Sequence, residues 1–291
     1  MRVRWLNLLA SMGGIFSANS PDAQHKCDLQ AAPEFLFEHW PSDAECADRT
    51  PGQRLGPGPR LVAGNQHPYL RTRLEPLILS RSEVPALTIA ADASESIEIT
   101  GDRREDWSLR YCAYGEGSSE GEARDRLQDV SLIRTGGTIS LNGPGIGRMT
   151  GAGGNLIVAA PADAPITVHA SFAPVQVRKM TGPVRVTAIH ARAKILNATG
   201  SVDATGFVVD FAGSTGTVVL SAETEINLKL TSVRFDGTLT AWAQRPVRVL
   251  IPPAFQTPFQ AVVSRPQDFV CRTEFTAAIK REKKGGLHVF T

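Results

Sequence analysis

A nine-residue repeat between residues 165 and 209 constrains the fold of this chain more than any other feature. Its five consecutive blocks read PITVHASFA, PVQVRKMTG, PVRVTAIHA, RAKILNATG and SVDATGFVV. Positions 2 and 4 of every block are apolar, from Ile166 and Val168 to Val202 and Ala204, and positions 3 and 5 are mostly polar. This alternation is typical of a short strand with one buried face. Position 7 is apolar in every block except the first.

Stacked coils explain why the same inward residues recur at a fixed interval. One block cannot bury its own apolar pair, but parallel strands stacked at about 4.8 Å per rung can. Small residues and Thr-Gly pairs let the chain turn at the corners. A β-sandwich also uses short strands at near-regular spacing, but it does not keep a fixed inward position in each one. We therefore predict an all-β fold, a parallel β-solenoid (β-helix), with two blocks or about 18 residues per coil.

The residues before the repeat contain further predicted strands and a single predicted helix. The helix begins with the S-x-x-E capping pair Ser119 and Glu122. We assign residues 84–291 to the solenoid domain and residues 21–83 to an irregular, proline-rich segment with one strand near Pro76–Leu79. Alternation or turn composition also predicts strands at Ala86–Ala90, Ser96–Thr100, Trp107–Tyr111, Val130–Arg134, Thr138–Leu141 and Leu287–Phe290, a loop at Gly143–Gly154 and a solvated turn at Lys280–Lys284.

The N-terminus and the cysteines bear on cellular location. Residues 1–20 have a basic start, the apolar stretch Trp5–Phe16 and then small residues, which is the outline of a signal peptide. We therefore expect an exported protein of the periplasm or cell surface. The cysteines Cys27, Cys46, Cys112 and Cys271 form no C-x-x-C and have no zinc spacing, so we predict no metal site. The even count permits disulfides with three possible connectivities, of which the local one joins Cys27 to Cys46 and leaves Cys112 with Cys271. Four buried free thiols are the alternative.

Several of these motifs resemble a known family. The stretch Ile97–Leu109 (IEITGDRREDWSL), the capped helix and the V-x-V strands with T-G corners are similar to the bacterial putative adhesin family of unknown function. The resemblance continues to about Phe275 and covers about two thirds of the chain. It implies a single-stranded β-solenoid in an exported or cell-envelope setting, and it brings no catalytic residues. The T-G, A-T-G and Ala corners differ from the N-G and S-G-D corners usual in that family.

Enzymatic motifs are weak in this sequence. Gly117–Gly121 spells G-x-S-x-G, but an α/β-hydrolase needs alternating strands and helices, so Ser119 is better interpreted as a helix cap. The glycine-rich stretch Gly143–Gly147 lacks the G-K-[ST] of a phosphate loop, and no acid occurs between residues 164 and 202 to bind calcium. A β-helix polysaccharide lyase or hydrolase is the alternative function, with Asp203, Asp210 and Asp236 as the carboxylates of the repeat.

The same acid-free stretch is rich in cations. It carries Arg178, Lys179, Arg185, Arg192 and Lys194, in a chain with a net charge of only +2. Outward positions on stacked coils would make these residues a basic face that binds an anionic polysaccharide or a membrane surface. Ordinary solvated surface, with Arg185 and Asp203 paired on adjacent rungs, is the alternative. Nucleic acid is not expected, because no aromatic residues interleave with the charges. We predict a non-enzymatic structural or surface-interaction module without a cofactor.

Overall fold

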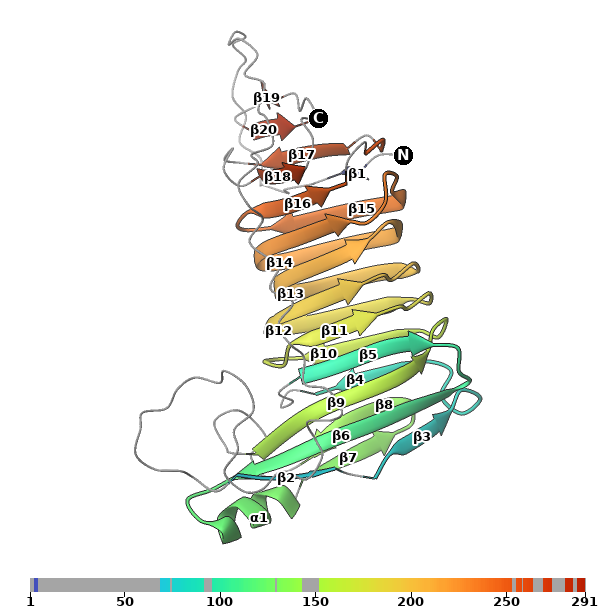
Figure 1. Ribbon diagram of the computed structural model, residues 1–291, viewed down its shortest axis with the longest axis vertical. Helices are drawn as coiled ribbons and strands as arrows, with labels where there is room; N and C mark the ends of the chain where they lie inside the picture. The colour runs from blue at the N-terminus through green and yellow to red at the C-terminus, as the bar shows by residue number, and fades with distance from the viewer. Residues whose placement is uncertain are drawn as a thin grey trace.

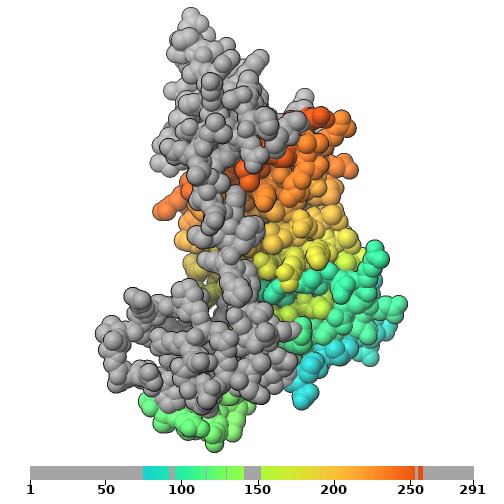
Figure 2. Space-filling view, viewed as in Figure 1, coloured from blue at the N-terminus to red at the C-terminus, as the bar shows by residue number. Residues whose placement is uncertain are grey.

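The protein is a parallel β-solenoid, as the repeat predicts. The computed structural model describes residues 3–4, 69–73, 75–91, 96–128, 130–142, 152–252, 255–257, 259–263, 269–273, 281–284 and 287–290. The coils are stacked along the long axis of the molecule, and sequence order follows the stack from β10 to β16 (Figure 1). In Figure 2 the described coils form a column coloured from yellow-green to orange in chain order.

Each coil has two flat faces joined at two corners. The long strands β12 (Val184–Leu196), β13 (Ser201–Gly213) and β14 (Thr215–Leu230) bend at a corner and contribute to both faces. Face 1 contains their first halves with β8 (Thr138–Asn142), β4 (Leu87–Ala90), β10 (Ile166–Ala170) and β15 (Asp236–Ala243). Face 2 contains their second halves with β5 (Ser96–Asp102), β11 (Val175–Arg178), β16 (Val247–Ile251) and β18 (Phe269–Thr273).

The strand register confirms the 18-residue coil in the repeat region. Ile166 pairs with Val184, and Val184 pairs with Val202. The register between β12 and β13 shifts between Ala188 and Arg192, so Ala193 pairs with Val209 at a spacing of 16. Val202 pairs with Val218 at the same shorter spacing. Apolar residues at positions 2 and 4 of all five blocks are buried, which makes one continuous core along the solenoid axis. Burial of this regular stack is the main stabilising contribution that the sequence pattern encodes.

Position 7 of the blocks behaves differently at the two corners. Met180 and Ala198 are buried, whereas Ile189 and Phe207 are 46% and 43% exposed. Two blocks make one coil, so successive position-7 residues lie at opposite corners. One corner turns its side chains inward, and the other presents them to solvent. The apolar character of position 7 therefore has two different structural meanings.

A column of glycines forms the corner at which position 7 is buried. Gly182, Gly200, Gly216 and Gly237 lie on successive coils, and the Cα of each packs on backbone of the coil before it. A Cβ on Gly216 would lie 2.5 Å from the carbonyl oxygen of Gly200, and its φ of 115° is also unfavourable for other residues. The Thr-Gly corners of the sequence are thus close backbone contacts between coils.

An antiparallel layer covers the first coil. The long strand β6 (Asp106–Glu116) pairs antiparallel with β9 (Ala152–Pro161), and β2 (Tyr69–Arg73) and β3 (Leu77–Ser80) pair with β6. The folded unit therefore extends N-terminal of residue 84. Two glycines of the predicted loop, Gly153 and Gly154, belong to β9 because they pair antiparallel with Tyr114 and Ala113 of β6. The rest of that loop, residues 143–151, lies outside the described residues.

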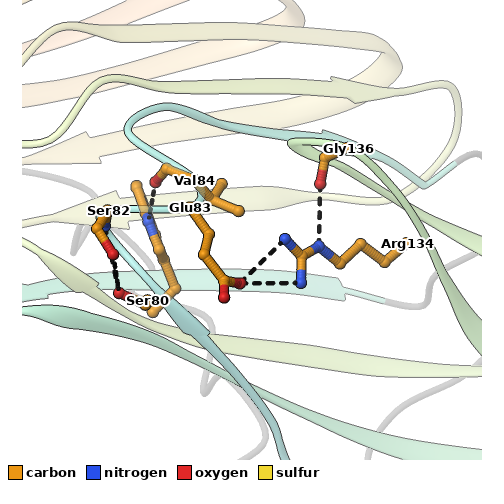
Figure 3. Close-up of polar contacts among 7 residues, drawn as sticks. Ser80, Ser82, Glu83, Val84, Arg134 and Gly136 are labelled. Carbon is orange, nitrogen blue, oxygen red and sulfur yellow. Dashed lines mark hydrogen bonds and ion pairs between the residues drawn. The ribbon is translucent and has the colours of Figure 1, made fainter.

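Polar contacts fix the turn 81–84 in this layer. Arg134, in β7 (Ser131–Thr135), reaches the Glu83 carboxylate at 3.4 Å and donates to the Gly136 carbonyl at 3.0 Å (Figure 3). The buried Trp107 indole donates a 2.8 Å hydrogen bond to the carbonyl of Val84. These contacts join the β7–β8 hairpin and β6 to the turn that precedes β4.

The predicted helix is present as α1 (Glu120–Gln128), beside β6 and β2 at this end of the molecule (Figure 1). Ser119 caps it, because its hydroxyl accepts a 3.2 Å hydrogen bond from the Glu122 N–H. The Glu122 carboxylate accepts bonds from the N–H and hydroxyl of Ser118, one residue earlier than an ideal capping box. Ser119 of the G-x-S-x-G match thus has a structural role at the helix start.

The C-terminal residues extend the stack and form a second sheet. β18 pairs parallel with β16 as a further rung of face 2. A four-stranded sheet contains β1 (Val3–Arg4), β17 (Phe259–Val263), β19 (Arg281–Lys284) and β20 (Leu287–Phe290). The predicted last strand is confirmed as β20, but the predicted turn at Lys280–Lys284 is wrong. Arg281–Lys284 is a strand because it pairs antiparallel with β20.

The structure narrows the predicted arrangements of the cysteines. Cys112 is disulfide-bonded, so four free thiols are excluded. Cys271 is not its partner, because β6 and β18 lie eight strand steps of about 4.8 Å apart and a disulfide requires Cα atoms within about 7 Å. Cys27 and Cys46 lie outside the described residues, as does most of the predicted signal peptide. No helix among the described residues is long and apolar enough to span a membrane.

Candidate functional surface

The five cations of the predicted basic face do not form one face. Arg185 points outward from face 1, whereas Arg178, Arg192 and Lys194 lie on face 2. Lys179 is exposed at a corner, with a φ of 58°. The bend within β12 separates Arg185 from Arg192 and Lys194, although all three belong to one strand. The prediction of a single basic face is therefore wrong in its geometry.

Each arginine of this set also has a carboxylate on the adjacent coil. Arg178 pairs with Glu98 and donates a 2.7 Å hydrogen bond to Thr100. Arg185 lies 3.4 Å from Asp203, and Arg192 lies 3.4 Å from Asp210. The Arg185–Asp203 pair is the one that the 18-residue coil predicts. Residues 164–202 contain no acid, but their neighbours in the stack supply one for each arginine, so most of the expected positive charge is compensated.

Face 2 carries a half-buried charged cluster, which we define as Arg192, Lys194, Asp210, Glu225, Asn227 and Arg248. Register places Lys194, Asp210, Asn227 and Arg248 side by side on four successive strands. The Asn227 amide donates to Asp210 at 2.9 Å and to Glu225 at 3.3 Å, and Arg248 pairs with Glu225. Lys194 is only 5% exposed and acts on Asp210 by its positive charge.

Burial dominates the electrostatics of Asp210. Desolvation raises the pKa of its carboxyl, against the opposing effects of the Asn227 hydrogen bond and the charges of Arg192 and Lys194. The cations of β12 and β16 flank the carboxylates of Asp210 on β13 and Glu225 on β14, so each carboxylate is engaged by a cation and by the Asn227 amide. Among the described residues, no group of three or more His, Cys, Asp and Glu side chains is placed to hold a metal ion. The cluster is built to link coils.

A pH titration tests this electrostatic description. Because the native pKa of Asp210 is above its ordinary 3.8, the folded state holds the proton more tightly, and ionisation above about pH 4 lowers the stability of the wild type. We expect the free energy of unfolding of Asp210→Asn, relative to wild type, to rise with pH above that value. Urea unfolding at intervals from pH 3 to pH 7 measures this difference.

Asp163 provides a control of opposite sign. A hydrogen bond from Arg81 lowers the pKa of this exposed carboxyl, so the wild type gains stability as pH rises towards 3.8. The relative stability of Asp163→Asn should therefore fall over that lower range. A flat or falling difference for Asp210→Asn would show that burial does not control this carboxyl.

Face 1 presents a different surface, which we call the hydroxyl face. Its outward side chains are mostly threonine and serine, and all of them are half-buried or exposed. Two rows cross the coils: Thr138, Thr88, Thr167, Arg185, Asp203, Val219 and Thr240 in one, and Ser140, Ala90, His169, Thr187, Thr205, Ser221 and Trp242 in the other. Ser201, Thr217 and Thr238 begin a third row.

The hydroxyl face could have been found from the sequence. Positions 3 and 5 of the blocks on face 1 supply Thr167, Thr187 and Thr205. The sequence shows that these positions are polar. It shows that they share hydroxyl groups only when alternate blocks are assigned to separate faces. The prediction concentrated on charge and did not single out the hydroxyl groups.

The exposed corner between the faces carries apolar and aromatic residues. Phe172 is 59% exposed, and its ring stacks on the His190 ring with centroids 5.4 Å apart. The His190 Nδ1 lies 3.9 Å from a Glu223 carboxylate oxygen. Ile189 and Phe207 continue this corner on neighbouring coils. This corner borders the hydroxyl face but is not part of it.

Comparison with known proteins gives few matches. No family model and no curated protein matches the chain. A putative cell adhesion protein from Clostridium sporogenes is similar at a TM-score of 0.31 and 7% identity, over 62% of this chain and 99% of its own. A putative adhesin from Bacteroides fragilis is similar at a TM-score of 0.36 and 8% identity, over 70% of this chain and 94% of its own. The β-solenoid fold is established by the strand register of this chain.

Proposed function

We propose that the protein is a non-enzymatic, exported β-solenoid that acts as a structural or surface-interaction module, as an adhesin does. The observation that carries this proposal is the hydroxyl face, a regular polar surface that crosses seven strands from β8 to β15. A stack of coils with one continuous core is a rigid support for such a surface. The predicted signal peptide supports export.

The charged cluster supports a non-enzymatic function over the alternative β-helix lyase or hydrolase. Acid-base cleavage of a glycan needs two carboxyl groups directed at the substrate, one of them able to give or take a proton. In the cluster, Asp210 is engaged by Arg192 and Asn227, and Glu225 is engaged by Arg248 and Asn227. Substrate would have to displace these contacts. A role in linking coils uses them as they are.

Binding and cleavage assays on the same polysaccharides test the proposal. We expect the full chain to be retained on at least one insoluble polysaccharide from a panel of microcrystalline cellulose, chitin and crosslinked polygalacturonate. We expect it to release no reducing ends and no unsaturated products over prolonged incubation. Product release that is lost in Asp210→Asn would establish the enzyme instead, and retention on none of the polymers would contradict the binding function.

The anionic partners predicted from the sequence form one arm of this test. Because three of the five cations are paired, an anionic polymer would be held mainly by salt-sensitive contacts of low affinity. Retention on polygalacturonate should be compared at low and near-physiological salt, and vesicles with and without anionic lipid should be compared in the same way. Cell fractionation with N-terminal sequencing of the mature protein tests export separately.

A further inference from the structure

We infer that the hydroxyl face binds an uncharged polysaccharide, an inference that rests on the proposed binding function and names its ligand class. The face repeats in two directions. Adjacent coils place equivalent side chains about 4.8 Å apart, and outward residues along a strand are about 6.6 Å apart. Hydroxyl groups at this spacing can donate and accept hydrogen bonds along an extended chain of sugars, which itself repeats hydroxyl groups.

The hydroxyl groups are available for a ligand. Thr167, Thr187 and Thr205 lie on three successive strands and are half-buried or exposed. Within the described part of the chain, their side chains make no hydrogen bond. A ligand that contacts them therefore displaces water and breaks no protein contact. This distinguishes the face from the charged cluster, whose side chains already bind one another.

Charge complementarity favours an uncharged ligand. The acidic and basic side chains of the outward rows, Arg185 and Asp203, compensate each other at 3.4 Å. The face has no net charge to attract a polyanion, and a neutral ligand avoids the cost of desolvating unpaired charge. The pair adds directional donors and acceptors, which neutral sugars can use. Trp242 and Val219 supply apolar contacts for the non-polar faces of sugar rings.

The size of the face argues against a second copy of this chain as the occupant. Seven strands span about 29 Å, and five residues of each strand span about 17 Å, so the face covers about 500 Å². A stable protein–protein interface buries about 800 Å² on each partner. A polymer does not need that area at one site, because many molecules bind along one chain and act together.

Replacement of threonine by valine tests the inference, because it removes hydroxyl groups and preserves side-chain shape and strand propensity. The test variant is Thr167→Val, Thr187→Val and Thr205→Val combined. The matched control is Thr181→Val, Thr199→Val and Thr231→Val, three exposed threonines outside the hydroxyl face. A third variant places serine at the three test positions and so keeps the hydroxyl groups.

We expect retention on cellulose or chitin to weaken about tenfold or more in the valine variant, which corresponds to the loss of three hydrogen bonds. The control and the serine variant should bind within about twofold of wild type, since they keep the hydroxyl groups of the face. Melting temperatures of all four proteins should agree, which excludes unfolding as the cause. Binding in 0.5 M NaCl should be unchanged, because no net charge contributes.

The outcomes separate the inference from the proposed function. If wild type and the valine variant bind cellulose or chitin equally, the hydroxyl face is not the site, while the binding function stands. Retention on polygalacturonate alone, lost at high salt, overturns the inference and supports an anionic partner. Failure of wild type to bind any of the three polymers overturns both.

Discussion

Val186→Asp unfolds the solenoid, whereas Thr187→Asp leaves the melting temperature within a few degrees of wild type; this is the result we expect. Val186 is 1% exposed and lies between Val168 and Ala204 in the inward row. An aspartate there buries a carboxylate without a partner, at a cost of about 3–5 kcal/mol. Thr187 points outward from the next position of the same strand, so its aspartate remains hydrated.

Thermal and urea unfolding of both variants by circular dichroism measure this difference. The two substitutions introduce the same charge one residue apart, so intrinsic strand propensity and net charge are matched. A one-residue change of register would exchange the inward and outward side chains. Equal melting temperatures for the two variants would therefore show that the inward register is wrong. The expected loss is a large fraction of the roughly 5–15 kcal/mol that stabilises a typical domain, so the two variants should be clearly distinguishable.

The position of Val186 increases the effect of the substitution. β12 stands between β10 and β13 on face 1 and between β11 and β13 on face 2. In a solenoid, each coil is stabilised by its neighbours, so damage to a central coil removes contacts on both sides. We expect loss of strand signal well beyond the residues that contact Val186. A substitution at an end of the stack would remove contacts on one side only.

The coil itself could be predicted because the sequence repeats its physical requirements locally. Each block alternates inward and outward residues, and an 18-residue coil brings Val168, Val186 and Ala204 into one row. A period of two along the strand and a fixed period along the chain are both visible without knowledge of any distant contact. The Arg185–Asp203 pair follows from the same spacing.

The charge balance of the surface could not be predicted in this way, because its partners are distant in sequence. Glu98 neutralises Arg178 across 80 residues, since β5 is inserted into the stack beside β11. Between β5 and β11 the chain forms β6, α1 and the β7–β8 hairpin before it returns. Counting acids between residues 164 and 202 therefore misses the coil that lies next to them. On face 2 the register between β12 and β13 is 16 residues, so Asp210 pairs with Lys194, which the 18-residue coil does not predict.

The second large loss of stability is expected when alanine replaces a glycine of the column at the buried corner. A Cβ on Gly237 would overlap the carbonyl oxygen of Gly216, and the φ of Gly237 is 130°. Two costs therefore combine in Gly237→Ala, a steric one and a conformational one. Two other glycines separate them. Gly200 has the same kind of overlap, with the Gly182 carbonyl, but no positive φ, whereas Gly136 has a φ of 60° and nothing within 4 Å of an added Cβ.

We expect the three alanine variants to lose stability in the order Gly237, Gly200, Gly136. Gly136→Ala should cost about 1 kcal/mol, the price of a left-handed residue in open space. Gly200→Ala should cost about 2 kcal/mol, because the coils must move apart at one corner. Gly237→Ala should cost about 3 kcal/mol or more, since the steric and conformational terms act together. Urea unfolding of each variant measures these losses. If Gly136→Ala is as damaging as Gly237→Ala, then conformation alone explains the glycines, and close contact between coils is not what keeps the corner free of side chains.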